Sequence, residues 1–147
     1  MKKGVDYPGV TVVFACHDGK GNFLLSKRGA NCRDEEGRWN PGGGAVDVGD
    51  SLDDTLRKEI REEYCADVLG AEFLGHFEVF REHEGVRTHW VAFCYKVLLD
   101  PAQVRIGEPH KIDDIGWFPL DALPEPMHSQ WSRFAALYGE RLKEGGA

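Results

Sequence analysis

The segment "SLDDTLRKEIREEYCA" (51–66) constrains the possible folds most, because it is the clearest long amphipathic helix in the chain. Its apolar residues recur at four-residue steps and therefore share one helix face: Leu52, Leu56, Ile60 and Tyr64. Ser51 with Asp54 three residues later resembles the capping box that starts a helix, with Asp in place of the usual Glu. A helix with one apolar stripe must pack that stripe against another element, and the flanking sequence predicts strands.

Strand-like runs occur in two pairs, one on each side of this helix. The first pair is "VTVVFAC" (10–16) and "FLLSKR" (23–28), which the turn "HDGKGN" joins into a predicted hairpin. The second pair is "EFLGHFEVFRE" (72–82) and "RTHWVAFCYKVLL" (87–99), which the turn at "HEGV" connects. This order predicts an α/β fold with a mixed β-sheet between helices, and it differs from a series of βαβ units.

The other segments are mostly polar. Glycine-rich and polar composition predicts loops over "GANCRDEEGRWNPGGG" (29–44) and "GEPHKIDDIG" (107–116). "WFPLDALP" (117–124) predicts a short strand and turn, and "HSQWSRFAALYGERLKE" (128–144) predicts a second amphipathic helix. With 147 residues and no repeat or long linker, we expect residues 1–147 to form a single domain.

Charge and cysteine content exclude several classes of protein. A net charge of −7 argues against a polymeric nucleic acid as partner, because such binders usually carry a basic surface. The 4 cysteines are scattered without a C-x-x-C motif, so we expect reduced thiols and a cytoplasmic location. No signal-peptide pattern and no run of about 20 apolar residues is present, so we expect no membrane partner. A small phosphorylated ligand held through a metal ion stays compatible with this charge.

Carboxylates gather on one side of the first predicted helix. Glu59 lies beside both Glu62 and Glu63, because residues three and four apart are neighbours on a helix. Each like-charged pair costs about 0.2–0.5 kcal/mol, which favours a cation near the cluster. Mg²⁺ commonly binds one or two carboxylates together with phosphate oxygens and water. The alternative is a solvated helix face on which Lys58 pairs with Asp54 and Glu62.

A glycine-rich segment, "NPGGGAVDVGD" (40–50), immediately precedes this helix. Gly42, Gly43 and Gly44 lack a Cβ, so their backbone can approach a ligand closely and can adopt positive φ. A glycine-rich loop that leads into a helix N-terminus also favours anions. We therefore expect these three glycines to bind substrate phosphates beside a metal held by the helix.

The stretch from Gly44 to Ala66 resembles the signature of the Nudix hydrolases, G-x5-E-x7-R-E-U-x-E-E-x-G-U, where U is a bulky aliphatic residue. Gly44 matches the first glycine, and "EIREE" (59–63) matches E-U-x-E-E in register. The segment "RWNPGG" (38–43) resembles the W-x-x-P-G-G sequence that commonly precedes the signature. The order of strands and helices resembles the Nudix α/β/α sandwich over most of the chain.

Four positions depart from that signature: Asp50 replaces Glu, Lys58 replaces Arg, Cys65 replaces Gly, and Ala66 replaces the aliphatic residue. Lys58 keeps the positive charge but lacks the planar fork with which Arg binds a carboxylate. The left-handed conformation that glycine adopts after a helix would cost Cys65 about 1–2 kcal/mol. We therefore expect this helix to end in another way.

The resemblance implies a metal-dependent, MutT-like hydrolase. Such an enzyme cleaves the diphosphate linkage of a nucleoside diphosphate derivative or a nucleoside triphosphate by attack of water on phosphorus. Glu59, Glu62, Glu63 and the Gly43 carbonyl would hold Mg²⁺ or Mn²⁺. Glu59, Glu62 and Lys58 would be catalytic, with Lys58 orienting a glutamate of the helix.

The resemblance leaves the general base open. It is either a glutamate of the helix or a residue of the 107–116 loop, where His110 is the nearest match by spacing and Glu108, Asp113 and Asp114 are nearby substitutes. Arg28 would contact substrate phosphates, although a surface arginine is nearly as common there. Trp39 either flanks the site or anchors its loop.

Substrate and assembly also stay open. The stretch "VFREHEG" (79–85) lacks both the proline typical of ADP-ribose enzymes and the tyrosine typical of dinucleoside polyphosphate enzymes. Many relatives are dimers, so a homodimer is compatible with the resemblance. The alternative function is a Nudix-fold nucleotide-binding module with little or no catalytic activity. An isomerase of isoprenoid diphosphates on the same fold finds no support in the residues.

Overall fold

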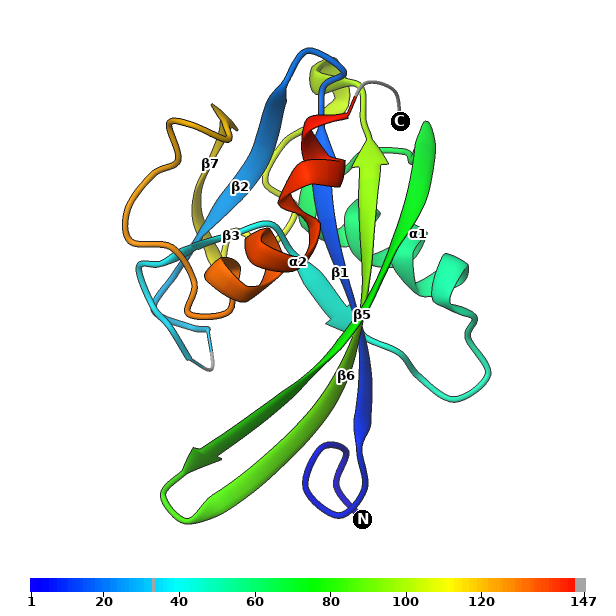
Figure 1. The fold of residues 1–147 in the computed structure, drawn as a ribbon, viewed down its shortest axis with the longest axis vertical. Helices are drawn as coiled ribbons and strands as arrows, with labels where there is room; N and C mark the ends of the chain where they lie inside the picture. Colours follow the sequence, from blue (N-terminus) through cyan, green and yellow to red (C-terminus); the bar gives the residue numbers. More distant parts are fainter. Residues whose placement is uncertain (33, 145–147) are drawn as a thin grey trace.

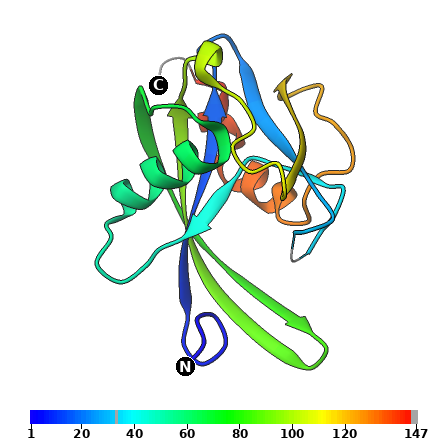
Figure 2. The ribbon, with the colours of Figure 1, turned by 180° about the vertical axis from the view of Figure 1, so that it is seen from behind.

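The computed structural model describes residues 1–32 and 34–144. Its centre is a seven-stranded mixed sheet with the order β3-β2-β1-β6-β5, in which β4 also pairs with β1 and β7 with β2. Helices α1 and α2 lie on opposite faces of this sheet (Figure 1, Figure 2). The elements are β1 (Gly9–His17), β2 (Asn22–Arg28), β3 (Trp39–Asn40), β4 (Gly43–Ala45), α1 (Leu52–Tyr64), β5 (Gly70–His83), β6 (Val86–Leu98), the short 3₁₀ helix η1 (Pro101–Gln103), β7 (Ile112–Pro119) and α2 (Trp131–Lys143). The predicted α/β fold with a mixed sheet between helices is confirmed.

Strand β1 organises the sheet because β6 pairs with it along one side, while β2 and β4 pair with different parts of its other side. It runs parallel to β6 along its whole length, and it forms the predicted hairpin with β2 near His17. Its other end pairs antiparallel with β4, where Val12 is opposite Gly44 and Val13 is opposite Gly43. The glycine-rich segment is therefore a strand fixed beside the sheet centre and in contact with α1.

Alternate residues of β1 supply two separate cores. Val12, Phe14 and Cys16 pack under α1 with its predicted apolar stripe, of which Leu56, Ile60 and Tyr64 are fully buried. Ala15 faces the other way and packs with the inner face of α2, which contributes Phe134, Tyr138 and Leu142. Both amphipathic helices thus bury their apolar faces against the sheet, as their spacing predicted.

The N-terminus of α1 follows the sequence expectation, whereas its C-terminus corrects it. The Ser51 hydroxyl accepts a hydrogen bond from the Asp54 N–H at 3.0 Å, and the Asp54 carboxylate accepts one from the Ser51 N–H, so the capping box is present. Cys65, however, does adopt the left-handed conformation, with φ 59° and ψ 27°. The segment after η1 explains how this is tolerated: the Arg105 N–H donates to Tyr64 O at 3.0 Å and the Gly107 N–H to Glu63 O at 2.9 Å. These bonds satisfy helix carbonyls that would otherwise lack partners.

Two predicted loops contain strands. The 29–44 segment includes β3 and the start of β4, and β7 begins at Ile112 inside the predicted 107–116 loop. β7 is polar in its first half because it is a sheet-edge strand, and its pairing with β2 compensates for its weak strand signal. Neither of the two α-helices, nor any other helix in residues 1–32 and 34–144, combines the length and apolarity needed to cross a membrane.

Candidate functional site

A cleft of about 580 Å³ opens between β2, the β3–β4 segment, α1 and the segment before β7. It collects polar residues that are far apart in the sequence. Its walls are formed by Ser26, Arg28, Asn31, Cys32, Asn40, Gly43, Gly44, Ala45, Glu59, Glu62, Glu63, Glu108, Lys111 and Ile112. All three predicted helix glutamates and two of the three predicted glycines therefore meet in one cleft.

Glu63 is the most constrained of these carboxylates. Its Oε2 is buried and has no hydrogen-bond partner among the described residues. Burial raises the pKa of Glu63 well above its usual range, the negative charges of Glu59 and Glu108 raise it further, and a backbone hydrogen bond from Gly43 opposes the shift. A buried oxygen without a partner, surrounded by negative charge, is the environment that a bound cation would stabilise.

Glu59 and Glu62 extend this acidic wall toward solvent. Glu59 is half-buried, and burial together with the charge of Glu62 raises its pKa. Glu62 is exposed at the mouth of the cleft. The wall therefore offers oxygen ligands from the buried floor to the surface, and hard divalent cations such as Mg²⁺ prefer oxygen ligands.

The glycines are required by close packing around these carboxylates. A Cβ on Gly44 would lie 2.3 Å from Cδ of Glu59, and one on Gly43 would lie 2.4 Å from the carbonyl oxygen of Val12. Gly42 has φ +122° and sits behind the cleft wall, where a Cβ would lie 2.5 Å from the Phe14 ring. Gly43 and Gly44 thus line the cleft, while Gly42 has a structural position next to it.

Two cations line the same cleft as the glutamates. Lys111 lines the cleft near the start of β7, and Arg28 lines it at the end of β2. The Arg28 guanidinium donates to the backbone oxygen of Asp34 at 2.9 Å and to its Oδ1 at 2.8 Å, so its orientation is fixed. A cleft lined by both carboxylates and cations suits a metal–phosphate ligand.

Lys58, which the sequence predicts to orient a glutamate of the helix, lies beside the cleft. It does not line the cleft; its side chain is 49% exposed, and its ion pair is with Asp47 at 3.8 Å. Lys58 precedes Glu59 by one residue, so it projects about 100° away around the helix axis. Among the described residues Lys58 forms no ion pair with a helix glutamate, although its charge opposes the rise in the pKa of Glu59 that burial and Glu62 cause.

The loop candidates for a general base differ in whether they line the cleft. Glu108 lines the cleft, whereas His110, Asp113 and Asp114 are exposed outside its wall. Glu108 is positioned by its neighbour Gly107, whose N–H bonds the end of α1; a Cβ at Gly107 would lie 2.0 Å from the carbonyl oxygen of Glu62.

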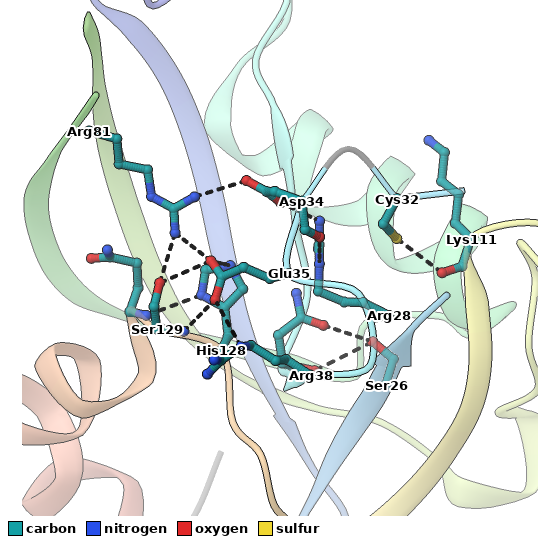
Figure 3. Close-up of polar contacts among 12 residues, drawn as sticks. Ser26, Arg28, Cys32, Asp34, Glu35, Arg38, Arg81, Lys111, His128 and Ser129 are labelled. Atoms are coloured by element: carbon teal, nitrogen blue, oxygen red, sulfur yellow. Dashed lines mark hydrogen bonds and ion pairs between the residues drawn. The ribbon is translucent and has the colours of Figure 1, made fainter. Parts of the chain in front are cut away.

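Sequence reasoning missed a polar network beside the cleft, which Figure 3 shows. Glu35 accepts hydrogen bonds from the Ser129 N–H at 2.6 Å and from the Ser129 hydroxyl at 2.9 Å, and it also pairs with Arg81 and with His128. Arg81 also pairs with Asp34, which holds Arg28. The network joins the segment after β2 to β5 and to the start of α2, and no local sequence pattern signals contacts so distant in sequence.

Asp34, Glu35 and His128 of this network form a compact group of possible metal ligands. Ligand atoms of Asp34, Glu35 and His128 lie within 4.8 Å of one another, closer than the set formed by the helix glutamates. Both Asp34 carboxylate oxygens are bonded, one to Arg28 and the other to Arg81. Since these acceptors already have cationic partners, the group is a structural ion-pair network, and the orphaned oxygen of Glu63 marks the better cation site.

Trp39 belongs to the same structural region. Its ring packs edge-on against Phe118 with centroids 5.4 Å apart, and the backbone N–H of Trp39 donates to the carbonyl oxygen of Pro126 at 2.9 Å. It does not line the cleft, so of the two roles considered for it the structure favours an anchor for β3.

Comparison with known proteins places this geometry in a family. Residues 7–137 match the family model of the NUDIX domain. The crystal structure of a MutT NUDIX hydrolase from Burkholderia pseudomallei is 31% identical, covers 88% of this chain and 96% of its own, and has a TM-score of 0.77. The NUDIX domain of Shewanella oneidensis NrtR, crystallised with ADP ribose, is 23% identical, covers 97% and 91% of the two chains, and has a TM-score of 0.74. A MutT protein from Methanosarcina mazei Go1 is 22% identical over 95% and 99%, with a TM-score of 0.76.

Proposed function

The chain belongs to the Nudix family, and from this premise we propose that it is a divalent-metal-dependent hydrolase of the diphosphate linkage in a nucleoside diphosphate derivative or nucleoside triphosphate. The observation that carries the proposal is the unpartnered, buried carboxylate oxygen of Glu63. It lies in a cleft that also contains Arg28, Lys111 and two closely packed glycines. Together these features suit a cation and an anionic phosphate side by side.

The cation would be held by the carboxylates of Glu59, Glu62 and Glu63 and by the backbone carbonyl of Gly43. When bound, Mg²⁺ or Mn²⁺ polarises phosphoryl oxygens and lowers the pKa of water. These oxygen atoms fit a divalent cation. Burial, and then neighbouring carboxylates, raise the pKa of Glu63 and of Glu59, and a bound positive charge would stabilise the ionised form of each.

The two cations of the cleft, Arg28 and Lys111, would bind and orient the substrate. Arg28, fixed by Asp34, and Lys111 would donate hydrogen bonds to phosphate oxygens. The lack of side chains at Gly43 and Gly44 would let a phosphate approach the backbone next to Glu59. Orientation of the phosphorus toward an attacking water is a large part of catalysis for reactions of this class.

Glu108 is the loop group placed to accept a proton. We propose that a water oxygen attacks phosphorus, the bond from phosphorus to the bridging oxygen breaks, and the water proton passes to the Glu108 carboxylate. The bridging oxygen leaves on the second phosphate product. Glu59 is the competing base, because it is a half-buried carboxylate in the same cleft as Glu108.

The proposal is tested by product release from a panel of nucleoside triphosphates, oxidised nucleoside triphosphates and nucleotide sugars with Mg²⁺ or Mn²⁺. Glu62→Gln should lower kcat by about 100-fold or more, since it removes charge at the reacting centre. Asp53→Asn is the matched control, because Asp53 is on the same helix, 63% exposed and paired only with Arg57 among the described residues. Wild-type turnover by the Glu62 variant would refute the assignment.

The base is assigned by a second pair of variants. Glu108→Gln should lower kcat by about 100-fold and flatten the acidic limb of the pH–rate profile, while His110→Gln, outside the cleft, should leave both unchanged. An intact pH profile in the Glu108 variant would move the role to the helix.

A nucleotide-binding module without activity is the second candidate. The observation in its favour is Lys58, which pairs with Asp47 and not with a glutamate of the helix. Saturable, metal-dependent nucleotide binding without product at high protein concentration would support this candidate over hydrolysis.

A further inference from the structure

A second cleft, of about 660 Å³, lies on the α2 side of the sheet, away from the acidic cleft. It is formed where the turn between β1 and β2 meets the end of β6 and the C-terminal end of α2 (Figure 1). His17 and Lys96 line its wall, although they are only 4% and 2% exposed. Two buried polar side chains in one cleft outside the acidic site require an explanation.

Lys96 is a buried cation without a counter-ion among the described residues. Its ammonium group donates to the carbonyl oxygen of Glu144 at 2.6 Å, an acceptor with only a partial negative charge. An ammonium has three donors, so two hydrogen-bonding directions are left for other partners. A buried charge is costly unless it is paired, which favours an anion at this position.

His17 adds a second donor. Its Nδ1 accepts a hydrogen bond from the Gly19 N–H at 3.1 Å, so in the neutral ring the proton is on Nε2. Burial, and then the charge of Lys96, lower the pKa of His17, which keeps the ring neutral near pH 7. Nε2 is buried and has no partner among the described residues.

The nearby carboxylates do not serve these two donors. Asp18 accepts hydrogen bonds from the Lys20 N–H at 2.7 Å and the Asn22 side chain at 2.9 Å, and Glu72 pairs with Arg141 at 2.5 Å. Asp121, at the rim of the cleft, is exposed. Glu144 also lines the cleft, but it is exposed and only its backbone carbonyl contacts Lys96, so Lys96 and His17 have no carboxylate partner among the described residues.

We propose that this cleft is a binding site for a phosphate-class oxyanion, held by the Lys96 ammonium and the Nε2–H of His17. The pairing of β1 with β6 brings the two residues together. His17 is opposite Leu98, and Leu98 follows Lys96 by two residues on β6, so Lys96 and Leu98 are on the same face of the sheet. Two donors from different strands suit two oxygens of one anion. Because both groups are buried, the interaction takes place in a low dielectric, where charge-assisted hydrogen bonds are strong.

The test uses the full chain without divalent metal, with inorganic phosphate replacing chloride at constant ionic strength. The unfolding midpoint of the wild type should rise saturably with phosphate. Lys96→Met removes the charge at similar length, and we expect it to weaken the apparent affinity by about tenfold or more. Lys20→Met makes the same charge change at an exposed position outside the cleft wall and should retain the wild-type response.

Phosphate binding in the acidic cleft is separated by Lys111→Met. That variant should retain the phosphate response if the site is at Lys96, and a response lost in Lys111→Met but kept in Lys96→Met would overturn the proposal. A direct readout on the wild type does not depend on any variant folding. The ¹⁵N resonance of His17 Nε2 should shift saturably with phosphate while Nδ1 keeps its acceptor character, and an unmoved Nε2 resonance would equally overturn the proposal.

Discussion

The phenol of Tyr64 donates a 2.8 Å hydrogen bond to the backbone carbonyl oxygen of Pro41 in the buried interior. Tyr64 ends the helix that carries the glutamates, and Pro41 precedes the glycines of β4. This hydrogen bond therefore ties the helix that carries the glutamates to the segment that carries Gly43 and Gly44.

Tyr64→Phe should lower the free energy of unfolding by about 1–3 kcal/mol, because it leaves a buried carbonyl without a donor. Tyr138→Phe is the control, since Tyr138 donates a similar 3.0 Å bond to His76 O on the opposite face of the sheet. Urea unfolding measures both variants. Only the Tyr64 variant should also weaken metal-dependent turnover, and equal activity in the two would show that this bond does not position the site.

Glu63→Gln should raise metal-free stability by about 1 kcal/mol or more, since it replaces a buried carboxyl whose charged form is disfavoured by burial and by Glu59. It should also abolish the rise in melting temperature that Mg²⁺ or Mn²⁺ gives the wild type. Glu62→Gln, at an exposed position, should change metal-free stability by less than about 0.5 kcal/mol. Calorimetry with and without metal checks both, and a metal response retained in the Glu63 variant would contradict the assigned ligand.

Gly44→Ala should lower kcat by about 100-fold, because its Cβ would lie 2.3 Å from Cδ of Glu59 and must displace that carboxylate. Gly139→Ala is the matched control, since a Cβ there meets nothing within 4 Å and Gly139 is in α2. That control should leave activity unchanged and add about 0.5–1 kcal/mol of helix stability. Normal turnover in Gly44→Ala would mean that Glu59 need not occupy this position.

Cys65→Gly should stabilise the protein by about 1 kcal/mol, because glycine adopts φ 59° without the steric cost of a Cβ. Cys65→Ala keeps the Cβ and should show no such gain. Urea unfolding of both variants separates the effect of backbone strain on stability from the effect of losing the thiol. A glycine variant no more stable than the alanine variant would be evidence against strain at Cys65.

Glu35 should contribute to acid sensitivity. Burial alone would raise its pKa, but hydrogen bonds from Ser129 and Arg81 and the charge of His128 lower it from 4.5 to about 2. The folded pKa is below the unfolded value, so the stabilisation is complete above about pH 4.5 and is lost as pH falls toward 2. Glu35→Gln should therefore destabilise the protein at pH 6 and much less at pH 2.5. Urea unfolding measures the difference in free energy of unfolding between wild type and variant at each pH. The same difference at pH 6 and pH 2.5 would contradict the role of Glu35.

Local periodicity predicted the parts of the site that one helix carries. Glu59, Glu62 and Glu63 are within two turns, so their common face follows from helix geometry alone. The predicted β1–β2 and β5–β6 hairpins also depend on short connections and are present. These features need no information about distant contacts.

The rest depends on contacts between distant segments. Glu35 and Ser129 are separated by 94 in sequence number, so no local pattern signals their hydrogen bonds. β7 is a strand because β2 is available to pair with it, and its own polar first half predicts a loop. Cys65 likewise adopts a conformation that its own propensity opposes, since Arg105 and Gly107 supply donors to the helix end.

The attachment of Gly107 to Glu63 has a consequence for how relatives of this protein can diverge. The backbone that presents Glu108 is bonded to the helix that carries the other carboxylates, so the four acidic groups behave as one unit. Insertions or deletions before residue 107 would disturb this attachment, and a length change at 109–110 would displace Lys111, whose N–H donates to the Glu108 carbonyl oxygen at 2.9 Å. The number of residues from the end of α1 to Lys111 therefore sets the placement of a carboxylate and a cation at once, which predicts little tolerance of length variation in this connection.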